Sequence, residues 1–93
     1  MNETEQLERV VAATAAGMKA MLNSLGLAKF EDVRPADAQV LANAAYAALV
    51  NILAHCFTDG AARDAMARIY GGEACRQDVA NMLGKLVERG AVR

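Results

Sequence analysis

Residues 38–58 read A-Q-V-L-A-N-A-A-Y-A-A-L-V-N-I-L-A-H-C-F-T, twenty-one positions without a charged side chain. In a chain of 93 residues with 23% charged residues, this gap predicts one helix that is apolar around most of its circumference. We expect the helix to begin at Pro35, because proline suits the first helical position, and to end near Phe57. Such a helix needs a cover: the rest of the chain, a second copy, a partner protein or lipid.

The rest of the sequence predicts an all-α protein with a single domain over residues 1–93. Helical periodicity and turn residues give four helices, with expected bounds 3–24, 35–57, 60–70 and 73–89. Gly71 and Gly72 separate the last two. No stretch alternates with period two, so we expect no strand beyond a short tail at residues 91–93. The predicted fold is a compact bundle of about four helices around the central apolar helix at residues 35–57.

Composition narrows the function classes without naming one. The net charge of −1 gives little of the positive field that nucleic-acid binding uses. The first residues are acidic and carry no basic segment, so we expect no secretory signal. Without such a signal, Cys56 and Cys75 are expected to be reduced thiols. These features together favour a soluble, cytoplasmic protein.

The first predicted helix carries apolar or small residues at spacings of 4-3-4-3-4. This heptad seam consists of Leu7, Val11, Thr14, Met18, Met21 and Leu25. The spacing is that of the a and d positions of a coiled coil, but about three heptads is short for one. We therefore favour a core-facing stripe within the bundle. Gly17 lies beside the seam, and close approach of another helix there would offset the cost of about 1 kcal/mol of a mid-helix glycine.

Polar, uncharged residues interrupt the central helix at intervals of four. This polar stripe consists of Gln39, Asn43, Asn51 and His55, with Ala47 at the remaining position. Two interpretations stay open: the stripe faces solvent, or it lies in an interface where amides hydrogen-bond to a partner, as a buried asparagine does in coiled coils. The residues we assign to such a protein interface are Asn43, Ala47, Asn51 and His55, flanked by Tyr46 or Leu49 as an anchor.

Lipid is the least favoured cover for the central helix, although its length permits a membrane span. The strongly apolar residues are Val40, Leu41, Leu49, Val50, Ile52, Leu53 and Phe57. Side chains of this kind contribute only about −2 to −4 kcal/mol of insertion free energy in total. The polar stripe opposes insertion, and alanine is close to neutral. We therefore expect no membrane partner.

The residue pattern offers no site for catalysis, a metal or a cofactor. His55 and Cys56 are neighbours, so on a helix their side chains point about 100° apart and the imidazole cannot easily activate the thiol. No cysteine or histidine spacing is typical of a zinc site. Gly71 and Gly72 lack the surroundings of a phosphate-binding loop. We expect neither an enzyme nor a cofactor-binding protein.

The end of the sequence supports a second hypothesis. Residues 76–93 read R-Q-D-V-A-N-M-L-G-K-L-V-E-R-G-A-V-R. This run resembles the recognition-helix end of winged-helix bacterial regulators at Val79, Leu83, Leu86, Glu88-Arg89-Gly90 and Val92-Arg93. The resemblance implies a helix in the DNA major groove, followed by a wing strand. The DNA-binding residues would be Arg76, Gln77, Asn81 and Lys85.

Three features depart from the winged-helix pattern. The family's wing would need sequence beyond Arg93. Gly71 and Gly72 lie one or two positions early, and Asp78 puts negative charge on the reading face. The leading hypothesis is therefore a small helical protein that acts by protein–protein contact, as a homodimer or as a regulator or inhibitor docked on a larger bacterial or phage protein. DNA binding by the last helix is the alternative.

Overall fold

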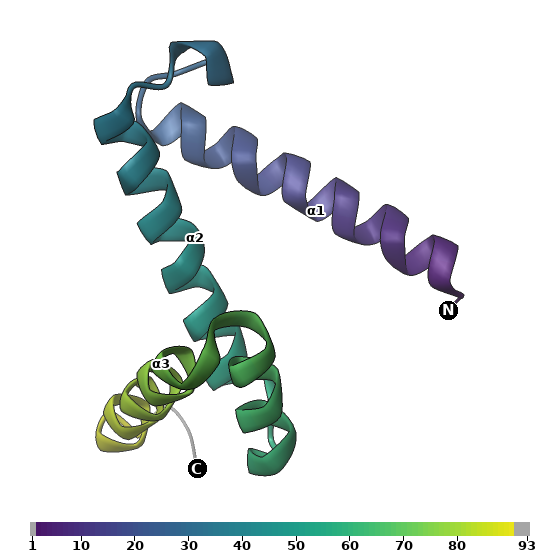
Figure 1. The fold of residues 1–93 in the computed structure, drawn as a ribbon, viewed down its shortest axis with the longest axis vertical. Coiled ribbons are helices and arrows are strands. Elements are labelled where there is room, and N and C mark those ends of the chain that lie inside the picture. The colour runs from purple at the N-terminus through teal and green to yellow at the C-terminus, as the bar shows by residue number, and fades with distance from the viewer. Residues whose placement is uncertain (1, 91–93) are drawn as a thin grey trace. The chain divides into compact units, whose positions relative to one another are not determined.

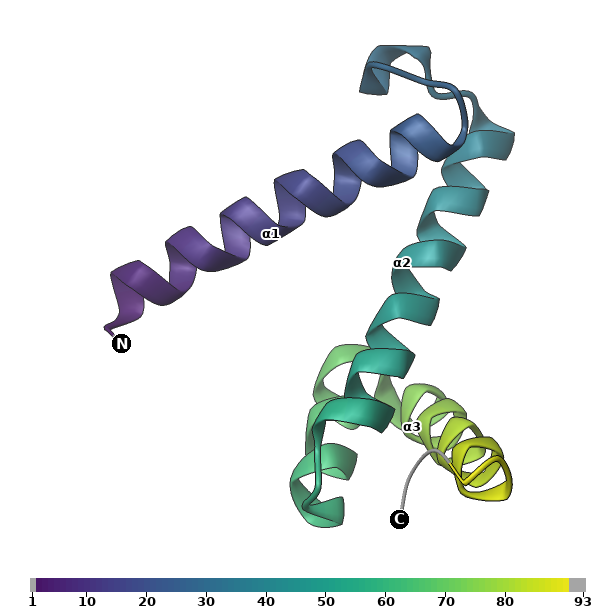
Figure 2. The same ribbon diagram turned by 180° about the vertical axis from the view of Figure 1, so that it is seen from behind.

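The computed structural model describes residues 2–90, and within them the chain is all-helical and contains no strand (Figures 1 and 2). The elements in chain order are α1 (Glu3–Ser24), the 3-10 turn η1 (Phe30–Asp32), α2 (Pro35–Cys56) and α3 (Gly60–Glu88). The all-α prediction is confirmed. The chain divides into two units, Met1–Ala42 and Asn43–Arg93, so that α2 belongs to both. The tail predicted at residues 91–93 lies outside the described residues.

Both ends of α1 follow from local sequence. The Asn2 side-chain oxygen accepts a hydrogen bond from the Glu5 backbone N–H at 2.8 Å, and the Glu5 carboxylate accepts one from the Asn2 amide at 3.4 Å. The first bond is that of a capping box, but the return bond comes from the Asn2 side-chain amide and not from its backbone N–H. At the other end Gly26 has φ +72°, and the Leu27 N–H donates to the Leu22 carbonyl at 2.9 Å. The left-handed glycine and this bond close the helix as a Schellman motif.

A kink inside α3 replaces the predicted break between two helices. Gly72 has φ +70° and ψ −163°, so its backbone is not helical. The helix continues on both sides as an N-terminal arm (residues 60–71) and a C-terminal arm (residues 73–88), which change direction at the kink (Figures 1 and 2). The described residues therefore contain three α-helices, and a four-helix bundle is not confirmed. Asp59 caps α3, and its side-chain oxygen accepts a hydrogen bond from the Ala61 N–H at 3.0 Å.

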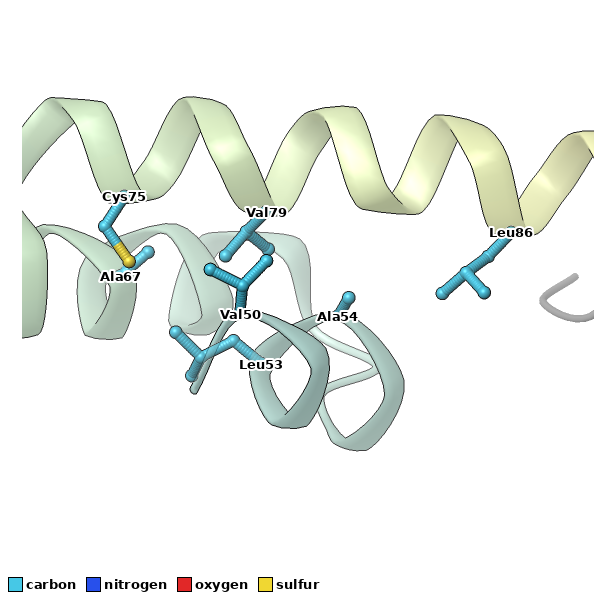
Figure 3. Close-up of a cluster of buried hydrophobic side chains, with 7 residues drawn as sticks. All are labelled: Val50, Leu53, Ala54, Ala67, Cys75, Val79 and Leu86. Carbon is cyan, nitrogen blue, oxygen red and sulfur yellow. The ribbon is translucent and has the colours of Figure 1, made fainter. Parts of the chain in front are cut away.

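The hydrophobic core lies in the second unit, between the last turns of α2 and both arms of α3 (Figure 3). Its buried members are Val50, Leu53, Ala54, Ala67, Cys75, Val79 and Leu86. Figure 3 shows Val50 of α2 close to Val79 of the C-terminal arm, and Cys75 beside Ala67 of the N-terminal arm. Burying a leucine or valine of this kind contributes about 1.5–3 kcal/mol. These few side chains thus hold the second unit together.

Small residues let the two arms of α3 approach each other near the kink. Ala67 and Cys75 are wholly buried. A Cβ atom placed on Gly71 would lie 2.5 Å from the Cys75 Cβ, closer than real side chains approach. Any larger residue at position 71 would therefore force Cys75 or the backbone at the kink to shift.

The predicted inward face of α3 is partly wrong. Sequence periodicity places Ile69 and Val87 on the core side, but Ile69 is 74% exposed and Val87 is also exposed. Ala67 takes the buried place in the N-terminal arm. Ala67 packs beside Cys75 of the C-terminal arm (Figure 3), and Ile69, two positions further along, lies about 200° around the helix from it.

The first unit has little core. Leu22 is the one buried residue within residues 2–42. The prediction that the heptad seam faces a core is wrong for its N-terminal half, where Leu7 is 64% and Val11 is 59% exposed. Phe30 does not fold into a core either, being half exposed. No element of this unit covers the first five turns of α1.

The apolar helix α2 is not buried along its length. Its buried residues are Val50, Leu53 and Ala54, all in the C-terminal half. Every described residue from 35 to 48 is exposed or half-buried. A bundle that surrounds α2 is therefore not confirmed by the described residues, and the cover that the sequence calls for is missing over the N-terminal half.

Candidate functional site

The polar stripe of α2 winds around the helix instead of keeping to one face. Each step of four residues advances by about 40°, because successive residues are about 100° apart. Asn43, Ala47 and His55 are exposed, whereas Asn51 is half-buried. The Asn51 amide donates to the Ala47 carbonyl of its own helix at 2.8 Å. This bond already uses one of the donors that a partner would need.

Tyr46, the predicted flanking anchor, is engaged within the second unit. Its hydroxyl donates to the Asp78 carboxylate, which joins α2 to the C-terminal arm of α3. Its ring lies 3.8 Å from the position that a Cβ on Gly71 would occupy. The hydrogen bond to Asp78, with smaller contributions from desolvation and from Cys75, holds the pKa of the Tyr46 hydroxyl well above its usual range. Tyr46 thus links two helices of this unit, while its ring stays partly exposed.

The residues proposed to contact DNA form hydrogen bonds with one another and with Glu73. Arg76 pairs with Glu73, with Nη2 to Oε1 at 2.5 Å, and it also donates to Gln77 Oε1 at 3.1 Å. Gln77 in turn donates to Asn81 Oδ1 at 3.2 Å. The pairing with Glu73 raises the pKa of Arg76, and Arg76 and then Arg68 lower the pKa of Glu73. Three of the four candidates therefore lie in one hydrogen-bonded row.

The charge of this helix does not favour DNA. Residues 73–89 carry three acidic and three basic side chains, so the segment is neutral. Lys85 is exposed, and Asp78 accepts the Tyr46 hydrogen bond. Binding to phosphates gains free energy from releasing counterions, which needs an excess of Lys and Arg. This arm does not supply one.

The surface that sequence reasoning missed is the exposed part of the heptad seam. Leu7 and Val11 of the seam, and Val10 beside the seam, are each 59% or more exposed on one side of α1. The signal was present in the 4-3-4-3-4 spacing, which we assigned to a core. Isolated apolar side chains on a surface are ordinary, but a row of them on a helix without a covering element is typical of an interaction site.

A groove of about 430 Å³ lies at the C-terminal end of α1, within the same unit. It is lined by Ala15, Met18, Lys19, Leu22, Asn23, Ala28 and Phe30. Its walls are mostly apolar, and Lys19 and Asn23 supply its polar groups. The volume far exceeds the roughly 30 Å³ that one water occupies, so the groove can admit apolar side chains.

The described residues hold no obvious chemical centre. Within residues 2–90 no group of three or more His, Cys, Asp or Glu side chains is placed to bind a metal. Cys56 is an exposed free thiol and Cys75 a buried one. Pro35–Cys56 is long and apolar enough to cross a membrane, a property that core helices share.

Comparisons with protein-family models, with curated proteins and with solved structures found no match to this chain. A functional conclusion therefore depends on the residues and their geometry alone.

Proposed function

We propose that this chain acts by protein–protein contact, as a homodimer or as a regulator that docks on a larger protein. The observation that carries the proposal is the exposed heptad seam on a unit with one buried residue, Leu22. Chains of about 40 residues rarely fold without disulfides, metals or association. A partner surface over α1 would supply the missing core.

The size of the exposed seam indicates how much a partner must cover. Leu7, Val10 and Val11 are each about 60% exposed. Burying them would contribute about 3–5 kcal/mol per chain at about 1.5–3 kcal/mol for each full side chain. Association costs about 4–15 kcal/mol. The three residues alone therefore give a weak complex, and a stable one must also cover apolar residues elsewhere, such as Val40 of α2.

A separate candidate surface lies along α2, within the second unit. It includes Asn43 and the exposed edge of Tyr46, followed along the helix by Ala47, Asn51 and His55. Its exposed alanines and amides suit a surface that is covered by protein. Lipid is a poorer cover, because the amides and the imidazole would lose hydrogen bonds with water. We propose a cytoplasmic setting for the same reason.

Hydrogen exchange tests the proposal. We expect the backbone amides of α1 to be protected at high protein concentration and to lose that protection on dilution, while the amides of α3 stay protected. Leu7→Glu should remove the protection of α1, and Ile69→Glu, an equal change at an exposed residue of α3, should leave it intact. If α1 exchanges freely at every concentration, and if Leu7→Glu changes nothing, a second copy does not cover the seam and the homodimer fails. A regulator docked on a larger protein would then show protection of α1 only when that protein is added.

A further inference from the structure

We infer that the occupant of the heptad seam is the α1 helix of a second copy, running antiparallel. Leu7 of each copy would lie against the groove at the C-terminal end of the other copy's α1, and Val11 would lie at the edge of that groove, beside Ala15. This inference rests on the proposed function and specifies its partner. Three independent features of α1 support it: the shape of the groove, the placement of charge and the position of Gly17.

The groove has the form of a coiled-coil hole. In coiled coils, a side chain of one helix inserts between four residues of the facing helix. Ala15, Met18, Lys19 and Leu22 stand at i, i+3, i+4 and i+7 on α1, and all four line the groove. Leu7 and Val11, the most exposed members of the seam, supply apolar knobs of suitable size. A helix therefore carries the knob in its N-terminal half and the hole in its C-terminal half.

The charges of α1 favour the antiparallel direction. Glu3, Glu5 and Glu8 lie in the N-terminal turns with Arg9, which leaves these turns with a net charge of −2, and Lys19 lies near the other end. A parallel pair would align the acidic turns of the two copies, and like charges repel. In an antiparallel pair with Leu7 opposite the second copy's Met18, the second copy's Lys19 lies about 3 Å along the axis from Glu8. The dimer then contains two such pairs, because Glu8 of each copy lies near Lys19 of the other.

Gly17 fits the same register. A Cβ atom on Gly17 would meet nothing within 4 Å among the described residues of its own unit, so no contact there requires glycine. In the antiparallel register Gly17 lies about 3 Å along the axis from Val10 of the second copy. Val10 is 59% exposed and has no covering element in its own unit. Because Gly17 has no side chain, Val10 of the second copy has room to pack there. This packing would account both for the glycine at position 17 and for the exposure of Val10 in the single chain.

Disulfide trapping tests direction and register. Two variants are prepared, L7C and M18C, each combined with Cys56→Ser so that the exposed native thiol cannot react. One variant is labelled with nitrogen-15, the two are mixed in a glutathione redox buffer, and the masses of the cross-linked species are measured. We expect the L7C–M18C heterodisulfide to exceed the L7C homodisulfide several-fold. Circular dichroism checks that both variants keep the helical content of the parent.

The possible results separate this inference from the function it rests on. A dominant L7C homodisulfide in a dimeric protein means a parallel pair, and no seam cross-link in a dimeric protein means another face. Either result overturns the inference and leaves the proposed function standing. A protein that stays monomeric, with α1 unprotected from exchange, overturns both the inference and the homodimer on which it rests.

A charge exchange provides a second test that needs no cysteine. Glu8→Lys and Lys19→Glu should each weaken the dimer about 10-fold, because each change creates two like-charge contacts. The double variant E8K/K19E should return the dissociation constant to near its original value. Glu88→Lys, the same change on α3, is the matched control and should have little effect. Absence of rescue in the double variant would overturn the antiparallel register.

Discussion

Gly71→Ala should destabilise the second unit, although alanine is the better helix former. The added Cβ would lie 2.5 Å from the Cys75 Cβ and 3.2 Å from its sulfur. Cys75 is wholly buried against Ala67, so it has little room to move away. Overpacking of this kind costs about 1–3 kcal/mol, and the gain in helix propensity returns at most about 1 kcal/mol. We expect a net loss of about 1–2 kcal/mol in the free energy of unfolding.

Gly84→Ala is the matched control in the same helix. A Cβ there meets nothing within 4 Å, so the substitution should raise the free energy of unfolding by about 0.5–1 kcal/mol. Urea unfolding followed by circular dichroism, at one fixed protein concentration, measures both changes. The opposite signs are the essential result. If Gly71→Ala stabilises the chain as much as Gly84→Ala does, the close approach of the arms at the kink is wrong.

Further predictions concern the Tyr46 hydrogen bond, the polar stripe and the DNA-binding alternative. Tyr46→Phe should lower the melting temperature by a few degrees through loss of the bond to Asp78, with Tyr70→Phe as the control. Because that bond raises the pKa of Tyr46, the parent should lose stability as the pH rises above about 10, where tyrosine in the unfolded chain ionises, and Tyr46→Phe should lose less. The double change Asn51→Leu with His55→Leu should alter the assembly measured by light scattering if the polar stripe lies in an interface; unchanged assembly would leave the stripe facing solvent. In gel shifts at low salt we expect no retardation of genomic DNA fragments, and retardation abolished by Arg76→Ala would favour the winged-helix alternative.

Local signals made much of the secondary structure predictable. Asn2 and Gly26 mark the ends of α1, and Asp59 starts α3, because each satisfies backbone groups within a few residues of itself. Gly72 marks the change of direction in α3, although the helix continues through it. These features depend only on neighbouring residues, so the sequence contains them in full.

Contacts between residues far apart in the chain could not be predicted from the sequence. The hydrogen bond from Tyr46 to Asp78 joins positions that are 32 residues apart, and no sequence pattern predicts it. The burial of Ala67 in place of Ile69 depends on how closely the two arms of α3 approach. Periodicity ranks residues by hydrophobicity and cannot supply that distance. Residues were therefore placed in the right helices but not always on the right face.

The sequence predicted that an apolar helix surface needs a partner, but it did not predict which helix carries that surface. The sequence indicated that an apolar helix needed a cover, and we assigned the contact to the polar stripe around Asn51. The described residues leave α1 uncovered instead, with Leu7 and Val11 exposed. Heptad spacing fits a bundle core and a coiled-coil partner equally well, so one sequence cannot tell which of them the seam contacts.

Sedimentation equilibrium of the full chain at about 1–100 µM tests the central claim most directly. The chain has a mass of 9.8 kDa. We predict a species of twice that mass at the upper end of the range, which Leu7→Glu returns to the mass of a single chain. A single-chain mass for the unaltered protein at every concentration would contradict the dimer through α1.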